Sequence, residues 1–91
     1  MDVRYNTDPE TGLPHIHAHG VTEDEAESVL RRPGEDRVAR DGCRSATGQT
    51  FAGRYLRIIY VRDAGAGGIF VVTGYEIHGK TLKAYRKRRR R

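Results

Sequence analysis

The 91 residues are enough for one small domain, and their composition argues against two classes of protein. The single cysteine, Cys43, cannot close an internal disulfide, which argues against a disulfide-held secreted scaffold. No apolar run approaches the ~20 residues that span a bilayer, so we expect a cytoplasmic protein without membrane contact. The formal net charge of +5 is uneven: residues 80–91 hold 8 cations and no acid, whereas residues 1–79 hold 9 cations and 12 acids. A basic end on an acidic body favours a polyanionic partner such as RNA.

The N-terminal third of the sequence predicts an irregular segment followed by one helix. Residues 1–14 are rich in the turn formers Asn, Asp, Gly and Pro and are expected to be irregular. A helix is predicted to begin after Thr22, because Thr22 and Glu25 have the spacing of a capping box. Its buried stripe is formed by Ala26, Val29 and Leu30. Pro33-Gly34 is predicted to end this helix.

Two runs rich in β-branched and aromatic residues, 54–62 and 69–77, predict a central antiparallel hairpin across a Gly-rich turn. Alternation places Leu56, Ile58 and Tyr60 on one face of the first run. Residues 43–49 predict another strand, which residues 50–53 turn into the hairpin, and residues 35–41 predict a short edge strand or a loop.

After the hairpin, residues 80–85 have helical spacing and predict a short basic helix. Residues 87–91 offer no apolar anchor and are expected to form a solvated basic tail. The predicted fold is therefore a single α+β domain spanning residues 1–91. It consists of a helix, a three- to four-stranded antiparallel sheet and a C-terminal basic helix.

If the polyanionic partner is RNA and is cleaved without a metal, the reaction needs a base for the ribose 2′-hydroxyl, cations for the phosphorane and an acid for the leaving oxygen. Candidates for proton transfer are His19, Glu76 and Tyr75, and candidate cations are Arg44, Arg54, Arg57, Lys80 and Arg86. His19 is the natural choice, since an unperturbed imidazole pKa of about 6.5 suits either role; the alternative is that it only caps a loop before the helix. Lys80, Lys83 and Arg86 are three apart and predict a phosphate-binding stripe on the last helix.

His15, His17 and His19 alternate, and on a strand they could face one way and bind zinc. A structural zinc site wants four ligands, and Cys43 is the only soft ligand elsewhere in the chain. A partly exposed group of histidines is therefore the preferred interpretation, and no metal site is assigned.

Several local patterns resemble the BrnT-like toxins and a related small bacterial domain family, both within the RelE-like group. The matching residues are 19–25 and 29–33 around the first helix, Arg44, Gly48-Gln49-Thr50, Ala52-Gly53-Arg54, the strand residues 56–61, the third strand as far as Tyr75-Glu76, and Tyr85-Arg86. The resemblance covers residues 15–88. Gln49 stands where such toxins commonly carry a lysine, and Tyr75-Glu76 stands where they generally carry a basic pair.

The resemblance implies a RelE-like fold and a metal-independent endoribonuclease without a cofactor, acting as the toxin of a bacterial toxin–antitoxin pair. Under it the catalytic candidates are His19, Arg54, Glu76 and Tyr85, and the RNA-binding candidates are Arg44, Arg57, Tyr75, Lys80, Lys83 and Arg86. A phosphate-binding cleft would also attract an acidic antitoxin protein. Two alternatives remain: a non-enzymatic nucleic-acid-binding module that uses the basic terminus, and a small interaction domain covered by an acidic partner.

Overall fold

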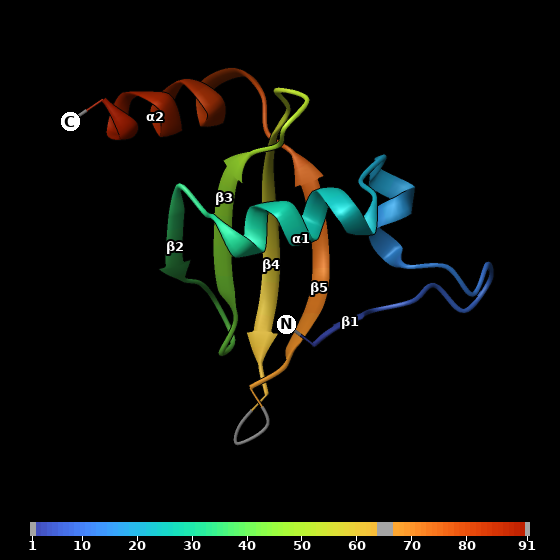
Figure 1. Cartoon of the computed structure of the whole chain (residues 1–91). Coiled ribbons are helices and arrows are strands. Elements are labelled where there is room, and N and C mark those ends of the chain that lie inside the picture. The colour runs from blue at the N-terminus through green and yellow to red at the C-terminus, as the bar shows by residue number, and fades with distance from the viewer. Residues whose placement is uncertain (1, 64–66, 91) are drawn as a thin grey trace.

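Five strands form one mixed sheet, with α1 packed on one face and α2 across one end (Figure 1). The computed structural model describes residues 2–63 and 67–90. Its elements are β1 (Val3–Tyr5), the 3₁₀ helix η1 (His15–His19), α1 (Glu23–Arg31), β2 (Glu35–Val38), β3 (Arg44–Gln49), β4 (Tyr55–Arg62), β5 (Ile69–Glu76) and α2 (Gly79–Arg89). The strand order is β1-β5-β4-β3-β2, and all neighbours are antiparallel except β1, which runs parallel to β5. The predicted α+β class is confirmed, but the expectation of a purely antiparallel sheet of three to four strands is wrong, since the sheet has five strands and is mixed.

The unexpected strand, β1, lies in the segment that was predicted to be irregular. Val3 pairs with Ile69 and Tyr5 with Val71, and both side chains are half-buried against the core. Three residues are too few to show the alternation by which a strand is recognised in a sequence. The pairing partner, β5, also lies 66 residues away, so no local signal could reveal the contact.

The central hairpin of β4 and β5 is confirmed, and it carries the core. Leu56, Ile58 and Tyr60 are at most 1% exposed, on the face that α1 covers. Gly74 of β5 leaves room for two core side chains, because a Cβ at this position would lie 2.7 Å from the Cδ1 atom of Ile58 and 3.3 Å from the Cγ2 atom of Ile16 in η1. The tip of the predicted turn, residues 64–66, lies outside the described residues, but its ends meet where the Asp63 N–H donates to the Gly68 carbonyl at 2.9 Å.

The helix α1 begins with the predicted capping box. The Glu25 N–H donates to the Thr22 hydroxyl at 3.2 Å, and the Thr22 N–H donates to a Glu25 carboxylate oxygen at 3.0 Å. Ala26 and Val29 are buried against the sheet, as their spacing predicts. The two hydrogen bonds of the capping box give partners to two N–H groups that the start of a helix otherwise leaves without one.

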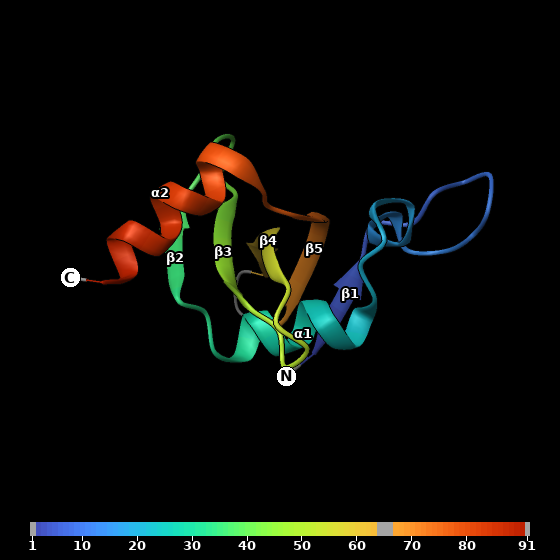
Figure 2. The same cartoon turned by 90° about the horizontal axis from the view of Figure 1, so that it is seen from above.

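The helix α2 is longer than predicted, because it runs to Arg89 and so includes part of the expected tail. Figure 1 shows it lying across the end of the sheet, and Figure 2 shows it on the side away from α1. Its one buried side chain is Tyr85, but Arg88 also donates to both carboxylate oxygens of Glu35 in β2. The anchor is thus ionic as well as apolar, which composition alone did not reveal. Among the described residues, no helix is long and apolar enough to cross a membrane.

Candidate nucleic-acid interface

A cleft of about 390 Å³ opens between α2 and the link that joins α1 to β2. Four arginines, two tyrosines, one glutamine and the Pro33-Gly34 pair line it: Arg32, Arg86, Arg89, Arg90, Tyr55, Tyr85 and Gln49. We call it the arginine cleft. Across residues 2–63 and 67–90, no side-chain carboxylate lies within 4.0 Å of these four guanidinium groups. Their charges are therefore available to an anion in the cleft.

Gly34 makes the cleft possible, because it lets α2 approach the start of β2. A Cβ at position 34 would overlap the hydroxyl oxygen of Tyr85. Arg89 donates to the Gly34 carbonyl at 3.0 Å, so the backbone at this position also holds the helix. The cleft wall is thus formed by helix residues seated on a position that carries no side chain.

Two tyrosines form the floor of the cleft. The rings of Tyr55 and Tyr85 meet edge to face with their centroids 6.0 Å apart, and the Arg86 guanidinium lies 5.9 Å from the Tyr55 ring centroid. Such contacts hold aromatic and cationic groups in fixed relative positions. Tyr55 projects from β4 on the face opposite Leu56, so the core and the cleft use alternate residues of one strand.

The phenol of Tyr85 stays protonated at neutral pH. Burial raises its pKa above the ordinary value, and the nearby Arg89 guanidinium only partly offsets this. A neutral phenol surrounded by arginines is a hydrogen-bond donor, and it can give its proton to an oxygen that develops negative charge. The arginines can stabilise a phosphate and the more highly charged phosphorane that forms from it.

Three of the four catalytic candidates gather at a different place, the N-terminal end of α1. Arg54 donates to the Glu25 carboxylate at 2.8 Å, to Glu76 at 3.2 Å and to the Gly20 carbonyl at 3.0 Å. The ring of His19 lies against that of Tyr75, with centroids 6.4 Å apart. The charge of Arg54 is therefore offset by two carboxylates, which suits a role in joining α1 to the sheet.

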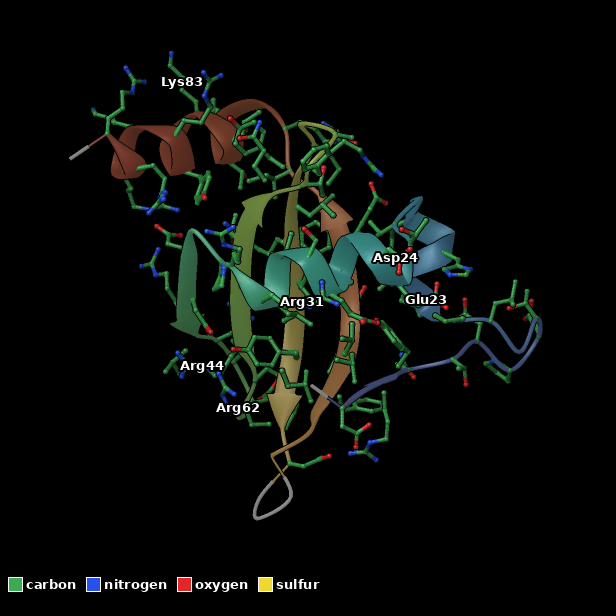
Figure 3. All side chains as sticks on the ribbon, viewed as in Figure 1. Glu23, Asp24, Arg31, Arg44, Arg62 and Lys83 are labelled. Atoms are coloured by element: carbon green, nitrogen blue, oxygen red, sulfur yellow. The ribbon has the colours of Figure 1, made fainter. Side chains whose placement is uncertain are left out.

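One RNA-binding candidate, Tyr75, lies against His19, and the other five are divided between α2 and two places on the sheet. Arg86 lines the arginine cleft and, with Lys83, a second hollow of about 340 Å³ along α2; Lys80 is exposed on the first turn of that helix. Figure 3 shows Lys83 pointing away from the sheet. Arg57 donates to the Thr47 hydroxyl at 3.1 Å on the face away from α1. Arg44 donates to Asp36 at 2.9 Å near the opposite end of the sheet, close to Arg62 in Figure 3.

Besides Pro33 and Gly34, five cleft residues were not among the candidates: Arg32, Gln49, Tyr55, Arg89 and Arg90. The sequence contains a signal for Arg89 and Arg90, because they follow Tyr85 and Arg86 by four residues, which is helical spacing once the helix is continued to Arg89. No comparable signal existed for Arg32 and Tyr55. They meet α2 only through the tertiary fold.

The three histidines at alternate positions lie on the 3₁₀ helix η1 and not on a strand, and the rings of His15 and His19 meet edge to face with their centroids 5.0 Å apart. His15 is hydrogen-bonded to Asp8 at 2.8 Å and His17 to Glu23 at 2.5 Å. The His17 hydrogen bond holds the pKa of the Glu23 carboxyl below its usual range. Within the described ranges, no three His, Cys, Asp or Glu side chains are arranged to hold a metal ion.

In comparisons with protein-family models, with curated proteins and with solved structures, nothing matches this chain.

Proposed function

We propose that the protein binds RNA in the arginine cleft and cleaves it there, as the toxin ribonuclease of a bacterial toxin–antitoxin pair. The observation that carries this proposal is the set of four guanidinium groups around Tyr85 in a cleft of about 390 Å³. Guanidinium groups match the geometry of phosphate oxygens and keep their charge at any physiological pH. The resemblance to BrnT-like and RelE-like toxins supports RNA as the substrate.

The reaction follows from the groups present. The ribose 2′-oxygen attacks phosphorus and the bond to the 5′-oxygen breaks, which leaves a 2′,3′-cyclic phosphate and a 5′-hydroxyl. The arginines stabilise the phosphorane, and the neutral Tyr85 phenol donates its proton to the leaving 5′-oxygen. The 2′-hydroxyl proton passes to solvent, from which Tyr85 is later reprotonated.

The test is cleavage of an end-labelled RNA by the wild-type protein in the presence of EDTA, with the product ends mapped. We expect a 2′,3′-cyclic phosphate, and we expect Tyr85→Phe to lower the cleavage rate about 10²-fold or more because the proton donor is lost. Arg44→Ala is the control, since Arg44 pairs with Asp36 outside the cleft. Intact RNA together with normal growth on induced expression would contradict the proposal.

A second candidate, binding without cleavage, is favoured by one feature of the cleft. Its described lining contains no His, Asp or Glu, the usual general bases near neutral pH. A pure binder would retain RNA intact, and Tyr85→Phe would change only its affinity.

In either case we propose an acidic antitoxin protein as the partner, because an acidic segment and RNA would compete for the same arginines. Displacement of labelled RNA by such a partner would be the direct check.

A further inference from the structure

One aromatic side chain beside the arginine cleft has no role in the fold. Phe51 is fully exposed at 106% of its reference area, whereas Leu13 and Val38, the other large apolar side chains exposed in the described structure, reach 52% and 79%. A phenylalanine buried in a core would contribute about 1.5–3 kcal/mol, and this position forgoes that gain.

Phe51 lies on a turn that connects two residues of the cleft. Gln49 precedes it by two positions and Tyr55 follows it by four, and both line the cleft. Two residues span at most about 7 Å, so the backbone of Phe51 is no farther than that from the backbone of Gln49. Figure 1 shows this turn at the same end of the sheet as α2. Phe51 therefore lies within two residues of the cleft lining without being part of that lining.

The turn holds Phe51 in a defined position. The Thr50 N–H donates to the Arg54 carbonyl at 2.7 Å, the Gly53 N–H to the Thr50 carbonyl at 2.9 Å, and the Arg54 N–H to the Thr50 hydroxyl at 3.0 Å. Thr50 is buried, and Gly53 has a φ of +96° that favours glycine. The Gln49 side chain donates to the Gly53 carbonyl at 3.3 Å and so connects the cleft to the turn. Because these hydrogen bonds already fix the backbone of the turn, binding a ligand through the exposed ring costs little backbone freedom.

We propose that Phe51 is a stacking platform for an unpaired base of the strand whose phosphates the arginine cleft holds. This inference rests on the proposed function and adds to it the class of substrate, single-stranded RNA. Base–aromatic stacking needs an unpaired base and is tolerant of sequence, whereas the arginines provide affinity for the backbone. Duplex RNA, whose bases are already stacked, would gain nothing from Phe51.

The experiment measures binding of a 2′-O-methyl single strand, which has no 2′-hydroxyl to attack, and of an abasic strand with the same number of phosphates. Stacking contributes about 1–3 kcal/mol per base, so Phe51→Ala should weaken binding of the single strand about 5- to 150-fold. Binding of the abasic strand and of a duplex should not change. Leu13→Ala is the matched control, since it removes another exposed apolar side chain.

Phe51→Trp gives a direct signal, because the chain contains no tryptophan and the new indole would be the only one. We expect its fluorescence to be quenched by the single strand and unchanged by the abasic strand. Stacking would be overturned if Phe51→Ala left the affinity for the single strand unchanged. It would also be overturned if Phe51→Leu bound the single strand as tightly as the wild type. Arg89→Ala separates the two proposals. If it binds as the wild type does, the arginine cleft itself is wrong; if only Phe51→Ala binds normally, stacking alone is wrong.

Discussion

Arg54 shows how one residue can have the right chemistry for a site and still serve the fold. The resemblance marked it as catalytic, and a guanidinium is a suitable group for a phosphorane. In the structure it donates to Glu25, Glu76 and the Gly20 carbonyl, and its side chain is 30% exposed. A phosphate would have to compete with two carboxylates for it. What fixes the role of a cation is its neighbours, and sequence does not show these.

Arg54→Ala is therefore expected to destabilise the protein and to leave RNA binding in the cleft nearly unchanged. The substitution leaves Glu25 and Glu76 without their shared cation, and we expect the free energy of unfolding to fall by about 1–3 kcal/mol. Urea denaturation would measure it. Arg31→Ala is the control, because its exposed pair with Glu27 at 3.6 Å should contribute less than about 1 kcal/mol. If Arg54→Ala had normal stability but did not cleave RNA, Arg54 would act in cleavage and not in the fold.

At the scale of elements, the position of α2 determines whether the cleft exists. Only Tyr85 of this helix is buried; in addition Arg88 pairs with Glu35, Arg89 donates to the Gly34 carbonyl, and Arg86 lies over the Tyr55 ring. A helix held by so few contacts should open more easily than α1, which packs on the core. The binding surface is thus coupled to a weakly held element.

Gly34→Val is expected to displace α2 and to remove RNA binding while most of the sheet persists. The new side chain would occupy the position of the Tyr85 hydroxyl. Faster amide exchange in α2 than in β4, together with at least a tenfold loss of affinity, would be the expected result. Gly12→Ala is the control: its φ of +70° also disfavours a side chain, but nothing lies within 4 Å of the added Cβ. Equal loss of affinity in both variants would mean that general destabilisation is the cause.

The contact between Glu35 and Arg88 predicts how α2 responds to acid. The hydrogen bond from Arg88 lowers the pKa of Glu35 in the folded state, despite some burial that raises it. Stability from this pair is therefore present above the unfolded pKa of about 4.3 and is lost as the pH falls through the lower folded value. Thermal melts from pH 7 to pH 3 should show a smaller acid-induced decrease for Glu35→Gln than for the wild type. Identical pH profiles would exclude this contribution.

Local patterns in the sequence were sufficient for some elements only. The capping box located α1, and the two β-branched runs located the central hairpin, because these signals lie within a few residues of one another. The strand β1 was missed, since its only evidence is a partner at the other end of the chain. The end of α2 was misplaced because Arg88 and Arg89 are held by groups on β2 and before it. The arginine cleft is formed by three segments that are distant in the sequence, within residues 32–34, 49–55 and 85–90, so the sequence predicted only part of it.

On the scale of the whole molecule, charge separation sets how binding should respond to salt. For a single strand, each neutralised phosphate contributes about −0.7 to the slope of log affinity against log salt. The four arginines of the cleft alone predict a slope of about −3, and Arg89→Ala should make it shallower by about 0.7. Binding titrations at several salt concentrations would measure both values. A slope near −6 would instead mean that all 8 cations of residues 80–91 contact phosphates.

The pairing of β1 with β5 has a consequence for the time course of folding. The hydrogen bonds between β1 and β5 can form only when Val3 meets Ile69, 66 residues later in the chain, and closing so long a loop is slow. During synthesis at about 5–20 residues per second, the first strand would remain without its neighbour for several seconds. The hairpin of β4 and β5 needs no such delay. Although β1 is made before its neighbour β5, it is thus expected to be among the last elements to reach its native position.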